Sequence, residues 1–412
     1  MEQSLTGGLL AGLRVLDLSR VLAGPWCTQI LGDLGADVIK VERPRSGDDT
    51  RNFGPPWLEP PNRDLSRESA YFICANRSKR SITVDIATQE GQAIIRSLAA
   101  RADVLVENFK TGDLARRGLG YEALSAINPR LIYCSITGFG ATGPQAQDPG
   151  YDYLIQAQGG LMSLTGPPDG AGGGGPTRVG LAISDLTTGM NAATAILAAL
   201  YWRASTGRGQ WIDISMLDVQ VSWLANQAQA YFATGKVPAR TGDQHSSIVP
   251  YQPFNTSDGQ LIIAVGNDAQ FHRLCAVLEC AELALDKRFA TNEDRVANRS
   301  VLSAELSARI ACRSTETLQA QLRLEKIPCG KIQTLDEVFT DPQILARQMI
   351  ATLPHASLGT VRTVANPMKF SATPIAYTRP PPTLGEHTNE VLQSELGYSA
   401  DAIDDLRARG VI

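Results

Sequence analysis

Short hydrophobic runs alternate with longer amphipathic segments over the first 140 residues. The segment from Gly24 to Gly35 has proline at its start, glycine at its end and a hydrophobic face, which predicts a helix. Runs rich in β-branched residues predict strands over 13–18, 37–42, 81–86, 103–108 and 130–140. Strands separated by helices favour right-handed βαβ crossovers, so we predict a Rossmann-like α/β layer with a parallel sheet. Ligands of such sheets bind beyond the carboxyl ends of the strands.

The pattern changes near residue 225. Before it, the three- and four-residue spacing of Met190, Ala193, Leu197 and Leu200 predicts a buried helix, and 209–217 reads as a strand. After it, a turn and strand at 258–267 and several amphipathic helices predict a smaller α+β unit. We therefore expect a large Rossmann-like domain over 1–224, a small domain over 225–335, and a segment over 336–412 that returns to the large domain.

Composition excludes several classes of protein. A chain of 412 residues with 43% hydrophobic and 19% charged residues is typical of a soluble globular protein with more than one core. Its net charge of −4 gives no basic field for nucleic acid. Seven cysteines without CxxC pairs indicate reduced thiols, and we expect a cytoplasmic protein. No secretory signal and no apolar run long enough to span a membrane is expected.

Several catalytic motifs are missing from the sequence. The four histidines form no HExxH or HxH pattern, so no metal site is expected. There is no GxSxG elbow, and the first βα turn lacks the GxGxxG fingerprint, which argues against a Rossmann oxidoreductase. The glycine-rich loop 166–176 has no GK[ST] ending, and its role stays open. Carboxylate chemistry remains.

Asp185 is the best placed carboxylate. It lies where the apolar stretch 179–183 meets a helix expected to begin near Leu186. The helix dipole favours an ionised carboxylate there by about 0.3–2 kcal/mol, so we expect Asp185 to be charged at neutral pH. A simple N-cap role explains the same position, and from the pattern alone it is the more common role. Asp17 and Asp213 fall in strands and Asp152 in a turn, so the pattern alone does not settle the choice.

Six stretches, in order along nearly the whole chain, resemble the class III CoA-transferases. They are "LRVLDLSRVLAGPWCTQILGDLGADVIKVERPRSGDDTR", "NRSKRSITVDI", "VENFKTGDLARRGLGYEAL", "NPRLIYCSITGFGATGP", "GYDYLIQAQGGLMSLTG" and "GLAISDLTTG". The resemblance implies a nucleophilic aspartate that forms an acyl anhydride and then an aspartyl-CoA thioester. We match that aspartate to Asp185, with Asp152 as the rival. Apolar flanks would exclude water from the anhydride.

The resemblance also implies where CoA binds. Val21, Leu22 and Ala23 would line the pantetheine and thioester region, and Arg43, Asn108, Phe109 and Arg116 would contact CoA. Leu22 replaces the glutamine of the formyl-CoA transferases, which weakens an assignment to formate or oxalate. Three further cations would add positive potential or form a solvated charge run: Arg77, Lys79 and Arg80.

The substrates follow from two further stretches. Residues 244–268 and 379–388 look most like the subgroup that uses succinyl-CoA as donor and a dicarboxylate such as glutarate as acceptor. The distal carboxylate needs a cation, for which Arg20, Arg240 and His245 are candidates, each also explicable as a surface or interface residue. The resemblance implies an interlocked homodimer with CoA thioester as substrate and no permanently bound cofactor.

Two other functions must be distinguished from CoA transfer. The 2-methylacyl-CoA racemases resemble this family but need a histidine in a GHD motif, where this chain has Gly150-Tyr151-Asp152. A non-catalytic module that binds CoA esters would have no need of the intact "ISDLTTG".

Overall fold

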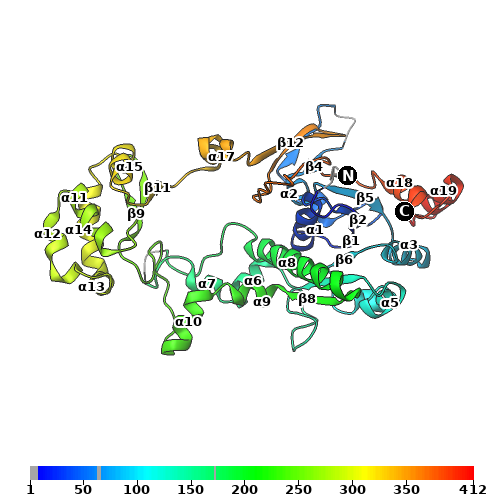
Figure 1. Ribbon diagram of the computed structural model, residues 1–412, viewed down its shortest axis with the longest axis horizontal. Helices are drawn as coiled ribbons and strands as arrows, with labels where there is room; N and C mark the ends of the chain where they lie inside the picture. The colour runs from blue at the N-terminus through cyan, green and yellow to red at the C-terminus, as the bar shows by residue number, and fades with distance from the viewer. Residues whose placement is uncertain (1–7, 63–65, 171–172) are drawn as a thin grey trace. The chain divides into compact units, whose positions relative to one another are not determined.

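The large part of the chain is built on a six-stranded parallel sheet. The computed structural model describes residues 8–62, 66–170 and 173–412 (Figure 1). The strands run in the order β5 (Lys79–Thr83), β2 (Asp37–Glu42), β1 (Arg14–Asp17), β6 (Val104–Glu107), β7 (Ile132–Thr137) and β8 (Trp211–Ser215). All five pairings are parallel. The predicted α/β fold with a parallel sheet is therefore confirmed.

Alternating residues send side chains to the two faces of the sheet. Val15, Val38 and Val104 belong to one core with α1 (Ala23–Asp33) and the long α8 (Ile183–Thr206). Leu16, Ile39 and Leu105 belong to the other core. The helices that supply residues to that second core are α3 (Gln89–Ala99), α4 (Asp113–Arg116), α5 (Tyr121–Ile127), α18 (Thr388–Ser394) and α19 (Ala400–Ala408). Two helical layers therefore enclose the sheet.

The end of the chain completes the second core. Val391 and Leu392 of α18 are fully buried there, and Val411 and Ile412 are 3% and 8% exposed. The carbonyl of Val411 accepts a hydrogen bond from the backbone N–H of Asp85 at 2.7 Å. The residues after about 345 thus return to the same unit as the parallel sheet.

Smaller elements join the main ones. The unit of the parallel sheet also holds α2 (Ala70–Ala75), α6 (Asp152–Gln158), α9 (Met216–Ser222), the 3-10 turn η1 (Asp49–Asn52) and two hairpins, β3 (Trp57–Leu58) with β4 (Glu68–Ser69) and β12 (Ile350–His355) with β13 (Gly359–Val364). Limits of the two units along the chain fall within α7 (Leu161–Leu164), α10 (Ala225–Thr234) and α17 (Pro342–Ala346).

The second compact unit has its own core. The chain divides into unit 1, the described residues of Met1–Leu161, Val179–Gln229 and Leu345–Ile412, and unit 2, those of Met162–Arg178 and Ala230–Ile344. Unit 2 has an antiparallel sheet of β11 (Cys329–Lys331), β10 (Gln260–Ala264) and β9 (Tyr251–Asn255). Around it are α11 (Asp268–Val277), α12 (Ala281–Leu285), η2 (Lys287–Phe289), α13 (Asn292–Ala297), α14 (Arg299–Ile310), α15 (Thr315–Leu324) and α16 (Leu335–Thr340). That these units fold as domains with limits near 224 and 335 stays a prediction.

The expected elements differ from the structure in two instructive places. The strand expected over 81–86 runs over Lys79–Thr83. The prediction begins too late because the first two residues of the strand are charged, and charged residues are seldom buried. Met190, expected inside a buried helix, is 52% exposed on α8. Residues 171–172 of the glycine-rich loop lie outside the described residues.

Candidate functional site

The strand order reverses between β1 and β6, which is where open α/β sheets bind ligands. Residues 19–22 follow β1 at this point, and Asn108 follows β6. The Asn108 side chain clamps the first loop: its Oδ1 accepts from the Arg20 N–H at 2.9 Å and its Nδ2 donates to the Arg20 carbonyl at 2.7 Å. The loops after β1 and β6 are therefore joined by hydrogen bonds at the switch point of the sheet.

A cleft of about 580 Å³ opens at this switch point, entirely within unit 1. Its walls include Asp185 of α8, Asp152 of α6 and Tyr151. Among the residues predicted to contact CoA or a substrate carboxylate, the cleft brings together Arg20, Val21, Ala23, Asn108 and Phe109. Leu22 is not part of the lining among the described residues, because its side chain is 5% exposed and packs inward.

Asp185 is not the N-cap of its helix. It is the third residue of α8, whose N-cap is Ala182 and has no side-chain cap. The cap is supplied from α6: Oδ1 of Asp152 accepts hydrogen bonds from the N–H groups of Ser184 at 2.7 Å and Asp185 at 3.3 Å. The other oxygen of Asp152 accepts from Gln156 at 2.7 Å. The N-cap interpretation of Asp185 is wrong, and Asp152 carries that role.

The environment of Asp185 also corrects its expected charge. Burial, and next the charge of Asp152, raise its pKa to about 7, while a backbone hydrogen bond from Ala23 acts in the opposite direction. Near neutral pH the group is therefore partly protonated, because desolvation outweighs the helix dipole that led us to expect full ionisation. Raised pKa values of this kind are typical of functional carboxyls in clefts.

Tyr71 of α2 lies near enough to Asp185 for the two to interact through charge, and no sequence motif indicates it. Burial, and next the charge of Asp185, raise the pKa of Tyr71 to about 12, so its hydroxyl stays protonated. Its ring packs edge-on against Phe53 with centroids 5.5 Å apart. The residue lies in an apolar helix with no motif around it, and only the fold brings it to Asp185.

A second cavity of about 290 Å³ shares Arg20 and Phe109 with the cleft. It is lined by Arg43 and Arg117, and by residues after β2 and β5. The guanidinium of Arg20 lies 5.2 Å from the centre of the Phe109 ring. Among the described residues, Arg116 lines neither the cleft nor the second cavity. Its exposed side chain pairs with Asp113, whereas its neighbour Arg117 lines the second cavity.

The cations of "NRSKR" are buried in ion pairs, so the interpretation as a solvated charge run is wrong. Arg77 is paired with Asp33 at 2.7 Å, Lys79 with Asp17 at 3.1 Å, and Arg80 with Asp37, Glu390 and Glu395. All three cations are at most 4% exposed. Their charges are balanced by neighbouring carboxylates, and their contribution of positive potential to a ligand stays a prediction.

Arg240 and His245 belong to unit 2. Arg240 pairs with Asp169, and its Nε donates to the Pro167 carbonyl at 3.1 Å. The His245 ring stacks on Tyr251 with centroids 5.1 Å apart. Within the described ranges, no group of three or more metal-ligating side chains is placed to hold an ion. No helix of those ranges is both long and apolar enough to cross a membrane.

Fold and site together define an α/β protein with a buried carboxyl of raised pKa at the switch point of a parallel sheet, beside a cavity lined by arginines. The model of CoA-transferase family III matches residues 10–388. The chain therefore belongs to this family of enzymes and is a class III CoA-transferase, as the six stretches indicated.

Individual relatives agree with the family. The chain is 46% identical over 383 residues to a succinate–glutarate CoA-transferase of Agrobacterium fabrum, covering 93% of this chain and 94% of that protein. It is 42% identical over 403 residues to the human succinyl-CoA:glutarate CoA-transferase, covering 98% and 90%. A crystal structure of a CAIB/BAIF family protein from Brucella suis is 47% identical with a TM-score of 0.84, covering 95% of this chain and all of that one.

Proposed function

We propose that this protein moves CoA from succinyl-CoA to a free dicarboxylate such as glutarate, with Asp185 as the covalent nucleophile. The observation that carries the proposal is the division of labour between two neighbouring carboxyls. Asp152 is occupied by three hydrogen bonds. Asp185 lines the cleft with a raised pKa. The names of the two relatives support succinyl-CoA and glutarate as the substrates.

The chemistry consists of acyl exchanges at one carboxylate. An oxygen of Asp185 attacks the thioester carbonyl of succinyl-CoA, and CoA leaves as thiolate, giving a mixed anhydride. The thiolate then attacks the aspartyl carbonyl and releases succinate, which leaves an aspartyl-CoA thioester. Glutarate attacks that thioester to give a second anhydride and thiolate. Attack of the thiolate on the glutaryl carbonyl yields glutaryl-CoA and restores Asp185.

The cleft and the second cavity offer an orientation for CoA. The thioester and pantetheine would lie along Val21, Ala23, Asn108 and Phe109 in the cleft. Leu22 would support this wall from inside. The phosphates would lie in the second cavity, where Arg43 and Arg117 supply fixed donors. Arg116 remains a candidate at the rim of that region.

Three residues are proposed to read the distal carboxylate, and Arg20 comes first. Its side chain lines the same cleft as Asp185. It is paired with Asp49 at 3.0 Å, while its buried Nε has no hydrogen-bond partner. An incoming carboxylate would satisfy that donor. Arg240 and His245 stay proposals for the same role.

The deciding experiment follows the covalent intermediate. Wild type is incubated with succinyl-CoA and glutarate, and glutaryl-CoA is measured by mass spectrometry. With succinyl-CoA alone, hydroxylamine should convert Asp185 to a hydroxamate. Asp185→Asn should bind succinyl-CoA and transfer nothing, whereas the matched Asp152→Asn should still transfer.

Other outcomes would overturn the proposal. A label on Asp152, or activity in Asp185→Asn, would contradict the assignment of the nucleophile. Binding of succinyl-CoA without transfer by wild type would favour a CoA-ester-binding module. Inversion of a 2-methylacyl-CoA would favour a racemase.

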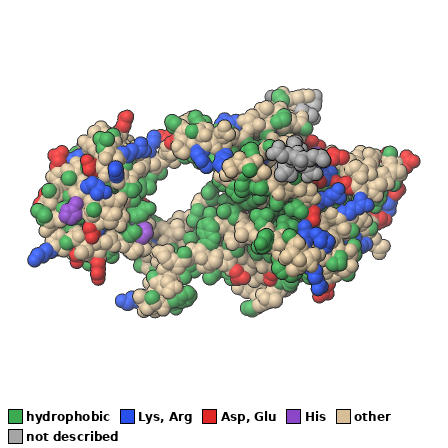
Figure 2. All heavy atoms as spheres, viewed as in Figure 1, with side chains coloured by type: hydrophobic (Ala, Val, Ile, Leu, Met, Phe, Trp, Pro, Cys, Tyr) green, Lys and Arg blue, Asp and Glu red, His purple; other side chains and the backbone are tan. Residues whose placement is uncertain are grey.

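We also propose a homodimer whose two chains interlock, on the strength of apolar surface. Figure 2 shows hydrophobic side chains gathered over α8. On this helix Met190, Tyr201 and Trp202 are 52%, 85% and 42% exposed. On α10 no residue is buried, and Phe232 is 73% exposed. Exposed apolar surface of this kind marks association.

A further inference from the structure

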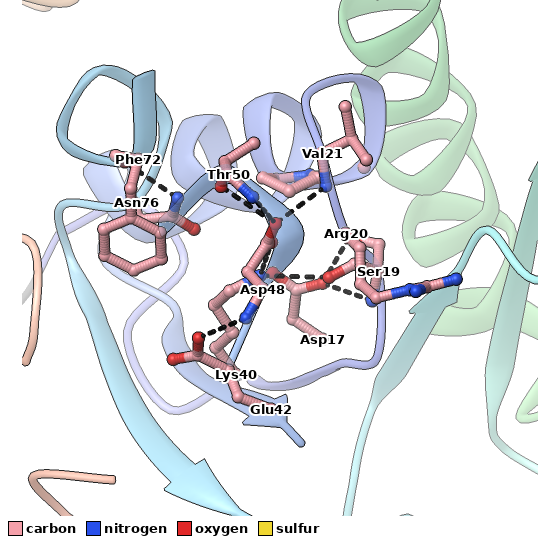
Figure 3. A network of polar contacts seen from close by, with 12 residues as sticks. Asp17, Ser19, Arg20, Val21, Lys40, Glu42, Asp48, Thr50, Phe72 and Asn76 are labelled. Carbon is pink, nitrogen blue, oxygen red and sulfur yellow. Dashed lines mark hydrogen bonds and ion pairs between the residues drawn. The ribbon is translucent and has the colours of Figure 1, made fainter. Parts of the chain in front are cut away.

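The turn formed by Ser19, Arg20 and Val21 is held by side chains at every step (Figure 3). The Ser19 N–H donates to Asp17 at 2.9 Å, and the Ser19 carbonyl accepts from Lys40 at 3.0 Å. Both peptide groups of Arg20 are clamped by Asn108. The Val21 N–H donates to Oδ1 of Asp48 at 3.2 Å. Four side chains therefore fix the backbone conformation of this turn.

Val21 is strained. Its φ is +69°, in the left-handed region that a β-branched residue rarely adopts. Such conformations persist only where the surroundings impose them, and they gather at functional sites. Two residues further on, the backbone of Ala23 is hydrogen-bonded to the Asp185 carboxylate. The strained turn thus leads directly into the contact with the reactive group.

The Lys40–Asp48 pair lies under this turn. The two charged groups are 2.8 Å apart and neither side chain is exposed. Burial raises the pKa of Asp48, but Lys40 and the hydrogen bonds outweigh it and lower that pKa to about 2. Burial likewise opposes the charge of Lys40, yet the carboxylates of Asp48, Asp17 and Glu42 raise its pKa. Both groups are therefore ionised.

A buried ion pair needs a reason beyond stability. Replacing such a pair by apolar residues is often neutral or stabilising, because desolvation cancels much of the attraction. Here the pair reaches two successive points of the turn: Lys40 holds the Ser19 carbonyl and Asp48 holds the Val21 N–H. No apolar pair could make those two contacts.

We infer that Lys40 and Asp48 are positioning residues: they hold Val21 in its left-handed conformation and thereby keep the Ala23 N–H on the Asp185 carboxylate. The inference rests on the proposed function, since it acts through the proposed nucleophile. The groups that face Asp185 are Asp152 of α6, Tyr71 of α2 and the Ala23 N–H of α1. Only the Ala23 hydrogen bond lowers the pKa of Asp185, so losing it should raise that pKa.

The test compares two buried ion pairs. Asp48→Asn removes the charge that holds Lys40 and weakens the contact with Val21. Asp33→Asn breaks the ion pair between Asp33, the last residue of α1, and Arg77. This pair is also buried, since the side chains of Arg77 and Asp33 are 4% and 1% exposed. Both variants should melt at a lower temperature than wild type, because each leaves a buried cation without its partner. Only Asp48→Asn should lower kcat, by about 10- to 100-fold.

The titration of Asp185 gives a second readout, which does not need turnover. Carbon-13 NMR of the aspartate carboxyls, assigned with Asp185→Asn, should show a higher pKa for Asp185 in Asp48→Asn and no change in Asp33→Asn. If wild type transferred no CoA but this shift appeared, the proposed function would fail and the positioning role would stand.

Two further variants guard against simple unfolding. Lys40→Met with Asp48→Leu leaves no unpaired buried charge and should show the same loss of kcat and the same titration shift. Because glycine adopts φ +69° freely, Asp48→Asn should lower kcat by a smaller factor when Val21→Gly is also present. An Asp48→Asn protein with wild-type kcat and an unmoved Asp185 titration would overturn the inference, as would the same result for the double replacement.

Discussion

Two carboxyls that a sequence motif cannot rank are separated by their hydrogen bonds. Asp152 is fixed at the start of α8, and its charge is compensated by backbone N–H groups, whereas Asp185 has only the Ala23 backbone against burial and a like charge. Asp152 thus holds the start of α8, whereas Asp185 is the acid whose pKa is raised. Such a pair can support covalent chemistry without exchanging roles.

The pH dependence of transfer tests this pairing. The proposed nucleophile, Asp185, must be ionised, so kcat/KM should rise with pH along an acid limb at about 7. In Asp152→Asn the like charge is gone while an oxygen remains to cap α8, so the limb should move to lower pH. Steady-state kinetics from pH 5 to 9 would measure the shift. A limb that stays in place would mean that Asp152 does not act on Asp185.

The same pKa predicts a change in stability. A carboxyl whose folded pKa of about 7 exceeds its ordinary value of 3.8 holds its proton more tightly in the folded protein. Its contribution to the free energy of unfolding is full below about pH 4 and is lost as the pH rises through about 7. Asp185→Asn should therefore melt at a higher temperature than wild type at pH 8, and gain much less at pH 5. A lower melting temperature at pH 8 would contradict this.

The two neighbouring arginines give another test at the scale of one residue. Arg117 lines the second cavity and Arg116 pairs outside it. Charged hydrogen bonds are worth about 1.5–3 kcal/mol, so Arg117→Ala should raise the KM for succinyl-CoA by about 10- to 100-fold. Arg116→Ala serves as the control and should change it much less, with the KM for glutarate steady in both. The reverse ranking would restore Arg116 as the CoA ligand.

At the level of elements, sequence pattern located strands better than it located charged partners. The strand Asp37–Glu42 was predicted to the residue. The next strand was displaced because Lys79 and Arg80 look like surface residues until Asp17 and Asp37, which lie far away in the sequence, are known to pair with them. Motifs likewise led to Asp185, Val21 and Asn108. Tyr71 carries no local signal, and only tertiary packing distinguishes Arg117 from its neighbour Arg116 in the same motif.

The crossing of α1 and α8 depends on Gly189. A Cβ at this position would lie 2.6 Å from the Ala23 carbonyl and 3.1 Å from the Trp26 side chain. Gly189→Ala should force the helices apart, lower the free energy of unfolding by about 1–3 kcal/mol and reduce kcat, since Asp185 lies one turn earlier on α8. Gly180→Ala, where nothing lies within 4 Å, is the control. Equal kcat in both variants would show that this crossing does not set the site.

For the whole molecule, the sequence predicted the parallel sheet and the family, while the association of chains rests on the proposal. Gel filtration with light scattering should give twice the chain mass of 44.2 kDa at every concentration tested, because interlocked chains cannot separate without unfolding. The exposed Tyr201 and Phe232 should become protected from surface labelling in that dimer. A folded, active monomer on dilution would refute the interlocking.

The burial of Val411 and Ile412 beside α3 and α19 has a consequence for biosynthesis. The core of unit 1 lacks members until residues 391–412 have been translated, so during synthesis it cannot be completed before they emerge from the ribosome. Meanwhile the parallel sheet presents one incomplete apolar face, and unit 2, whose core uses only residues 249–327, can close earlier. We therefore expect unit 2 to complete its core before unit 1 does during synthesis.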